Sequence, residues 1–88
     1  MGSNITFSPD GWADYLYWQA EDKKTLRRVN QLLQDILRSG PTGGIGKPEP
    51  LRHAKEWSRR IDEKNRLVYT IEDDCLIVLS CRGHYEDK

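Results

Sequence analysis

The sequence predicts an α+β fold in which two N-terminal helices pack on one face of a small, mainly antiparallel sheet. Three observations predict it: helical spacing of apolar residues in the first half of the chain, strand-like runs in the second half, and short polar turns between those runs. Consecutive strands after a pair of helices are typical of this class. With 88 residues, we expect one domain over residues 1–88.

The N-terminal elements are a short strand and two helices. Residues 5–7 are strand-like, and Ser8 followed by Pro9 supplies an N-cap and a first-turn proline for the first helix. Asp22 then caps a second helix, whose apolar residues follow i, i+3, i+4 spacing. The glycine-rich segment 40–44 ends that helix and opens a loop.

Three strands are expected after this loop, at residues 57–61, 66–71 and 75–82. The turns between them are short and polar, so the strands form an antiparallel meander. The predicted order is βααβββ, with an additional strand possible in the loop that precedes the meander.

Alternation along these strands predicts which side chains face away from the helices. If Trp57 and Ile61 enter the core, Ser58 and Arg60 emerge on the opposite, open face. On the next strand the odd-numbered residues turn inward, which leaves Arg66 on the open face with its even-numbered neighbours. The last strand is apolar on both sides and therefore ambiguous. Placing its odd-numbered residues, 75 to 81, inward puts the even-numbered ones and, by extension, His84 outward.

Composition restricts the class of protein. No stretch approaches the ~20 apolar residues of a membrane span, and the N-terminus lacks a basic segment followed by an apolar one, so we expect a soluble, cytoplasmic protein. Cys75 and Cys81 are expected to be free, buried thiols of a reducing compartment. Together with His84 they make too few ligands for a zinc site, and the sequence predicts neither a metal nor another cofactor.

The net charge is zero, but the charges are unevenly distributed. Residues 1–22 carry four acids and no Lys or Arg, residues 23–66 twelve bases and five acids, and residues 67–88 two bases and five acids. A basic middle suits a local phosphate-binding surface, although a solvated basic helix produces the same pattern. The neutral total argues against tight nonspecific binding to bare nucleic acid.

Arginines and a histidine on one face suit RNA cleavage. There the ribose 2′-oxygen attacks the adjacent phosphorus, and arginines stabilise the charge that grows on the phosphoryl oxygens. Glu49 is a candidate base for the 2′-OH proton, His84 a candidate acid for the departing 5′-oxygen, and Tyr85 can stack on a base. Two plainer interpretations stay open: Glu49 lies between prolines, as a surface group in a turn or edge strand would, and His84 is near the C-terminus, where side chains are usually solvated.

Five short segments occur in order along nearly the whole chain: DYLYW at 14–18, GKPEPL at 46–51, WSRRI at 57–61, RLVY at 66–69 and HY at 84–85. Together they resemble the YoeB branch of the RelE-type bacterial toxins. The resemblance implies a RelE-like microbial ribonuclease fold and the toxin of a type II toxin–antitoxin system. It also implies a metal-independent endoribonuclease that cleaves messenger RNA in the ribosomal A site and blocks translation.

The resemblance implies roles for single residues. The glutamate of KPEPL is Glu49, the general base, and the arginine that opens RLVY is Arg66, which stabilises the pentacoordinate phosphate. The closing pair is His84, the general acid, and Tyr85, which orients the substrate. The residues that would contact RNA are Lys47, Arg52, Arg59 and Arg60.

The resemblance also implies partners: a YefM-type antitoxin whose C-terminal segment folds onto the toxin, the ribosome with its messenger, and operator DNA only together with the antitoxin. A homodimer is compatible with it, and no membrane is involved. The chain departs from the family pattern at Gly83, where a larger residue is usual, and in the tail at residues 86–88. These departures motivate an alternative, a catalytically weak antitoxin-binding subunit that acts mainly as a transcriptional corepressor. A generic RNA-binding domain is a third hypothesis.

Overall fold

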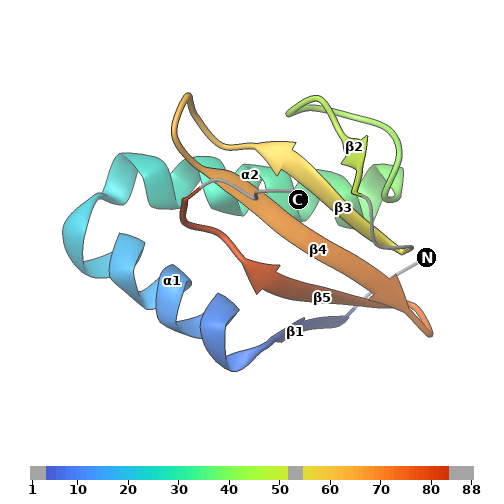
Figure 1. Ribbon diagram of the computed structural model, residues 1–88, viewed down its shortest axis with the longest axis horizontal. Coiled ribbons are helices and arrows are strands. Elements are labelled where there is room, and N and C mark those ends of the chain that lie inside the picture. Colours follow the sequence, from blue (N-terminus) through green and yellow to red (C-terminus); the bar gives the residue numbers. More distant parts are fainter. Residues whose placement is uncertain (1–3, 52–54, 84–88) are drawn as a thin grey trace.

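The computed structural model describes residues 4–51 and 55–83. In chain order its elements are β1 (Asn4–Phe7), α1 (Pro9–Glu21), α2 (Lys23–Ser39), β2 (Glu49–Pro50), β3 (Glu56–Arg60), β4 (Arg66–Glu72) and β5 (Cys75–Ser80). The strands form a five-stranded sheet in the order β1-β5-β4-β3-β2 (Figure 1). Only β1 and β5 pair in parallel, and the other neighbours are antiparallel. The predicted α+β class and mainly antiparallel sheet are therefore confirmed.

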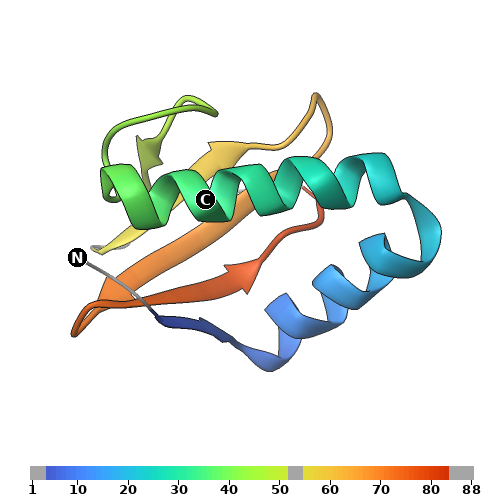
Figure 2. The ribbon, with the colours of Figure 1, turned by 180° about the vertical axis from the view of Figure 1, so that it is seen from behind.

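Both helices begin where their capping residues predict. The Ser8 hydroxyl accepts a hydrogen bond from the Gly11 N–H at 3.0 Å, and the Asp22 carboxylate accepts one from the Thr25 N–H at 3.1 Å. Such bonds satisfy amide groups that have no partner within the helix. Helix α2 runs across one face of the sheet, and α1 lies beside it at the β1 and β5 end (Figure 2). The opposite face of the sheet carries no helix among the described residues.

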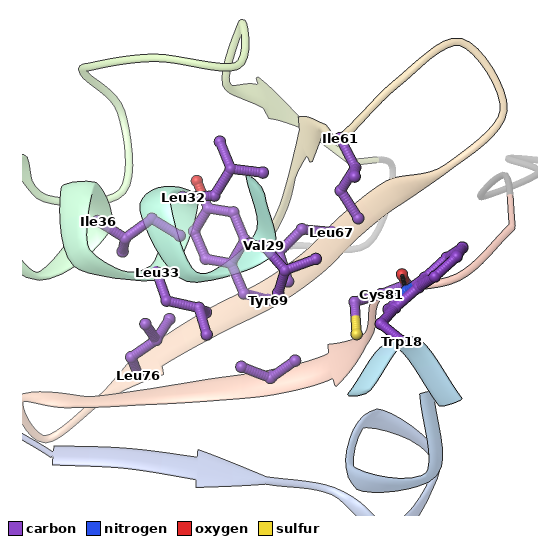
Figure 3. Close-up of a cluster of buried hydrophobic side chains, with 11 residues drawn as sticks. Trp18, Val29, Leu32, Leu33, Ile36, Ile61, Leu67, Tyr69, Leu76 and Cys81 are labelled. Carbon is purple, nitrogen blue, oxygen red and sulfur yellow. Dashed lines mark hydrogen bonds between the residues drawn. The ribbon is translucent and has the colours of Figure 1, made fainter. Parts of the chain in front are cut away.

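The hydrophobic core fills the space between α2 and the sheet, with Trp18 of α1 at one end (Figure 3). Leu67 and Tyr69 of β4 are fully buried there, and Trp57 of β3 packs against the cluster. Inward and outward side chains on β3 and β4 thus alternate as predicted. In the described ranges 4–51 and 55–83, neither helix is long and apolar enough to cross a bilayer.

The predicted facing of β5 is wrong over most of the strand. Leu76 and Val78, which were expected on the open face, lie in the core at 1% and 0% exposure. They pair with the inward residues Ile71 and Tyr69 of β4. The register then shifts between Val68 and Tyr69, so Ser80 pairs with Val68 on the open face. The shift places one extra residue of β5 opposite β4, which changes the alternation of side chains from there on. A mainly apolar strand gives no sign of such an extra residue in its sequence.

The cysteines agree with the sequence prediction in part. Cys75 and Cys81 are both free thiols, and Cys81 is buried, whereas Cys75 is only half-buried. The register shift returns Cys81 to the core side, where its N–H donates to the Asp14 carboxylate at 3.0 Å and its carbonyl accepts from the Trp18 indole at 2.8 Å. These bonds tie the end of the β5 segment to α1.

Candidate active site

An acid–arginine pair lies on the open face of the sheet. Glu49 belongs to the two-residue edge strand β2, as its flanking prolines predict, and Arg66 opens β4. Strand β3 separates them, and Arg66 Nη2 reaches across it to donate to Glu49 Oε1 at 3.1 Å. The Glu49 side chain is 63% exposed and that of Arg66 20% exposed. The structure thus brings together two candidate residues that are 17 positions apart in the sequence.

Ser58 lies between the two members of this pair. It is the register partner of Glu49 on β3, and its hydroxyl accepts a hydrogen bond from Arg66 Nε at 3.0 Å. Ser58 is fully buried, so this bond holds the guanidinium at a fixed point on the sheet. An arginine has five N–H donors. Two of those of Arg66 are used in the bonds to Ser58 and Glu49, and the other three make no hydrogen bond to the described residues.

Arg60 and Lys47 flank the pair. Arg60 is the register partner of Arg66 and therefore shares the open face with it, as strand alternation predicts. Its backbone N–H donates to the Gly46 carbonyl at 2.7 Å, which continues the pairing of β3 beyond the edge strand. Lys47 is exposed and adopts a left-handed φ of 53° just before Pro48. Arg60 and Arg66 therefore place two positive charges on the open face, and Lys47 adds an exposed one two residues before Glu49.

The prediction of Arg59 as an RNA contact is corrected by the structure. Its side chain is fully buried on the helix side of the sheet, paired with Asp35 of α2 and bonded to the Tyr69 hydroxyl. The hydrogen bond from Arg59 holds the pKa of Asp35 below its usual range. Burial raises the pKa of Tyr69, an effect that the neighbouring arginine opposes. Strand alternation alone puts Arg59 on the same side as Trp57 and Ile61, so the sequence did contain this signal.

The remaining candidates, Arg52, His84 and Tyr85, lie outside the described residues. The described chain ends at Gly83, which is bonded beside the acid–arginine pair. The Gly83 N–H donates to Asn65 Oδ1 at 2.7 Å, and its carbonyl accepts from the Arg66 N–H at 3.0 Å. Gly83 adopts φ 87°, a left-handed conformation that side-chain-bearing residues rarely adopt. A glycine therefore suits this turn, where a residue with a side chain would be strained.

Two features of the site were missed by sequence reasoning. Ser58 was placed on the open face but given no role, because only the tertiary structure shows that Arg66 bonds to its hydroxyl. Asp35 and Tyr69 were assigned to an amphipathic helix and to the core, and no local pattern marks them as partners of a buried arginine.

This arrangement suits phosphate chemistry. The exposed Glu49 carboxylate can accept a proton, and the Arg66 guanidinium, held by Ser58, can donate to phosphoryl oxygens a few ångströms away. Within residues 4–51 and 55–83, no group of three His, Cys, Asp or Glu side chains is placed to hold a metal ion.

Comparisons with known proteins identify the family and agree with the observed fold. Residues 7–85 match the family model described as the YoeB-like toxin of bacterial type II toxin–antitoxin systems. The chain is 48% identical over 83 residues to the toxin YoeB of Escherichia coli strain K12, covering 92% of this chain and 98% of that protein. A solved YoeB dimer from Staphylococcus aureus superimposes with a TM-score of 0.90 at 46% identity, covering 97% of this chain and 100% of that one.

A heterotetrameric YoeB–YefM toxin–antitoxin complex from the same organism matches with a TM-score of 0.87 at 46% identity, with 97% and 100% of the two chains covered. Two helices on one face of a mixed sheet, with an acid–arginine pair on the other face, define a small α+β toxin of the RelE-like kind. Within that class the chain belongs to the YoeB-like toxins of bacterial type II toxin–antitoxin systems.

Proposed function

We propose that this toxin is a ribosome-dependent messenger RNA endoribonuclease that acts in the ribosomal A site and thereby blocks translation. The observation that carries the proposal is the contact between Glu49 and Arg66 on the open face, 3.1 Å apart and backed by Ser58. A carboxylate beside an arginine supplies the proton acceptor and the charge stabilisation that cleavage needs. The activity resides in one domain of residues 1–88 and uses no metal.

In the proposed reaction Glu49 removes the proton of a ribose 2′-OH, and the 2′-oxygen attacks the adjacent phosphorus. Arg66 stabilises the added negative charge on the phosphoryl oxygens. The bond from phosphorus to the 5′-oxygen then breaks, His84 donates the proton to that oxygen, and a 2′,3′-cyclic phosphate and a 5′-hydroxyl result. Tyr85 orients the substrate. General acid–base catalysis of this kind contributes typically ~10²- to 10⁴-fold.

The resting ion pair also suggests how substrate enters. Glu49 is largely exposed, and its bond to Arg66 occupies one guanidinium donor. A phosphate that binds Arg66 replaces the carboxylate there and leaves Glu49 free to accept the 2′-OH proton. Arg60, Lys47 and Arg52 contribute further phosphate contacts in this proposal.

The proposed partners follow from the relatives. Because YoeB of Staphylococcus aureus forms a complex with YefM and also a dimer, a YefM-type antitoxin is the proposed inhibitor of this toxin, and a homodimer its proposed free form. We further propose a cytoplasmic location at the ribosome, and contact with operator DNA only in the antitoxin complex.

Translation extracts programmed with a reporter messenger test the function. Wild-type protein should cleave the messenger only when ribosomes are present, whereas Glu49→Gln and Arg66→Ala should cleave it at least about 100-fold more slowly. Glu72→Gln is the matched control, because it removes a carboxylate at the far end of β4, and it should retain wild-type activity. Absence of ribosome-dependent cleavage by the wild type would refute the function.

Equal cleavage by the wild type and by a Glu49→Ala, His84→Ala double variant would refute the assigned chemistry instead.

The corepressor alternative is tested by growth. A chain that is harmless when induced without antitoxin, yet shifts operator DNA together with it, would favour that alternative over the nuclease.

A further inference from the structure

Every side-chain N–H of Arg59 donates a hydrogen bond to another group of the protein. A guanidinium carries five N–H donors, and five acceptors surround this one at hydrogen-bond distance. They are the Tyr69 hydroxyl at 2.9 Å, the Asp35 carboxylate at 2.6 Å, the carbonyls of Ile45 and Gly40 at 2.9 Å each, and the carbonyl of Gly43. The charge is thus fully buried, fully bonded and paired with a carboxylate. We refer to Arg59, Asp35 and Tyr69 as the Arg59 cluster.

The Arg59 cluster holds the segment 40–46, which leads from α2 to β2. Besides the three carbonyls bonded to Arg59, the Pro41 carbonyl accepts from the Tyr69 hydroxyl at 2.8 Å, and the Ile45 N–H donates to Asp35 at 3.0 Å. Figure 3 shows the Tyr69 ring directed from β4 toward α2. A segment without helix or strand is thereby fixed by side chains from three separate elements.

Two glycines of this segment leave no room for a side chain. A Cβ at Gly44 would lie 1.7 Å from the Asp35 carboxylate, and a Cβ at Gly46 would lie 3.1 Å from the Cβ of Arg59 and 2.7 Å from Leu32. Both glycines also have positive φ, at 96° and 85°. A side chain at Gly44 or Gly46 would therefore force the backbone or its neighbours to move.

The segment ends where the candidate active site begins. Gly46 is bonded to Arg60 through its carbonyl, and three residues later Glu49 pairs with Ser58. Strand β3 thus carries Arg59 on its helix side and Ser58 on its open side. Glu49 lies on a strand of only two residues with a largely exposed side chain, so its position depends on how the preceding segment is held.

We propose that Arg59, Asp35 and Tyr69 are positioning residues for RNA cleavage, fixing the segment 40–46 so that Glu49 is held against Arg66. The inference rests on the proposed role of Glu49 and deepens it. None of the three side chains touches the RNA, and each acts through the backbone that carries the base.

Kinetics of the full-length protein on programmed ribosomes test this. Tyr69→Phe removes one hydroxyl and two hydrogen bonds without changing the ring, and we expect kcat to fall about 10- to 100-fold with KM changed less than about 2-fold, because small displacements of a catalytic group cost that much. Tyr15→Phe is the matched control. The Tyr15 hydroxyl also makes a part-buried hydrogen bond, to Asn30 at 2.9 Å between α1 and α2. The kcat of the Tyr15→Phe variant should stay within about 2-fold of the wild type.

A double-mutant cycle shows whether Tyr69 acts through Glu49. In a Glu49→Ala background there is no base left to misplace, so Tyr69→Phe should cause no further loss in single-turnover cleavage. A further loss of about 10-fold in that background, or an unchanged kcat for Tyr69→Phe alone, would overturn the proposal. Asp35→Asn, which keeps the shape of the side chain, should behave as Tyr69→Phe does.

A spectroscopic measurement separates this inference from the proposed function. The NMR signal of the Arg66 Nη2–H group, which donates to Glu49, reports this contact without any substrate. In Tyr69→Phe and Asp35→Asn it should move toward its position in Glu49→Ala, whereas in Tyr15→Phe it should remain at the wild-type position. A wild-type signal in both cluster variants would overturn positioning even if the protein is a nuclease. The expected movement would support positioning of Glu49 even if the wild type cleaved no RNA.

Discussion

Replacing Arg59 with lysine keeps the buried charge but removes the planar, five-donor group that the structure uses in full. A lysine ammonium has three donors. At least two of the five acceptors around this position, which include the Asp35 carboxylate and three carbonyls of the segment 40–46, must then lose their partner. Arg59 itself is fully buried, so water has little access to the space that its guanidinium occupies.

The size of the effect follows from these lost bonds. A hydrogen bond to a charged group contributes about 1.5 to 3 kcal/mol, so losing two of them costs about 3 kcal/mol at the lower end. The total free energy of unfolding of a domain this small is about 4 to 13 kcal/mol. Since 1 kcal/mol shifts the melting temperature of such a domain by about 4 to 8 °C, Arg59→Lys should melt at least about 12 °C below the wild type.

Urea and thermal unfolding, followed by tryptophan fluorescence and circular dichroism, measure this difference. Arg60→Lys is the matched control, because the same substitution one residue later falls on the open face and should change the free energy of unfolding by less than about 0.5 kcal/mol. A loss below about 1 kcal/mol for Arg59→Lys, or equal losses for both variants, would refute the reasoning that all five bonds are made.

Two further predictions concern the surroundings of Arg59, and a third concerns the buried thiol of Cys81. The hydrogen bond from Arg59 lowers the pKa of Asp35 in the folded state. The ionised Asp35 therefore stabilises the folded protein above the ordinary carboxyl pKa, and this contribution is lost as the pH falls through the lowered pKa. Urea titrations should show the difference in free energy of unfolding between wild type and Asp35→Asn shrinking below about pH 4. Gly44→Ala should cost about 2 kcal/mol or more in urea unfolding because of its positive φ and the 1.7 Å approach to Asp35, whereas Gly43→Ala, whose Cβ would meet nothing closer than 3.8 Å, should be tolerated; equal costs would contradict the close approach. Burial raises the pKa of Cys81 to about 12, so at pH 8 a thiol reagent should label Cys81 only after unfolding, and rapid labelling of a Cys75→Ser variant in its native state would contradict that burial.

The sequence by itself determined the class of fold and the ends of most elements. Ser8 and Asp22 begin the helices because their side chains bond to amides within three residues, and helical spacing of apolar residues marks the face of α2 that packs on the sheet. Alternation on β3 and β4 placed Arg60 and Arg66 on the open face. These features depend on neighbours a few residues away, and a single sequence contains that information.

Contacts between distant parts of the chain were decided by the tertiary structure. The facing of Leu76 and Val78 depends on the register in which β5 pairs with β4, and a mainly apolar strand fits either way. The bond between Arg66 and Glu49 joins residues 17 apart, and that between Arg59 and Asp35 joins residues 24 apart. Such pairs form only when packing brings separate elements together. The residue types of the acid–arginine pair were therefore readable from the sequence, whereas the buried arginine cluster beneath it appeared only in the folded chain.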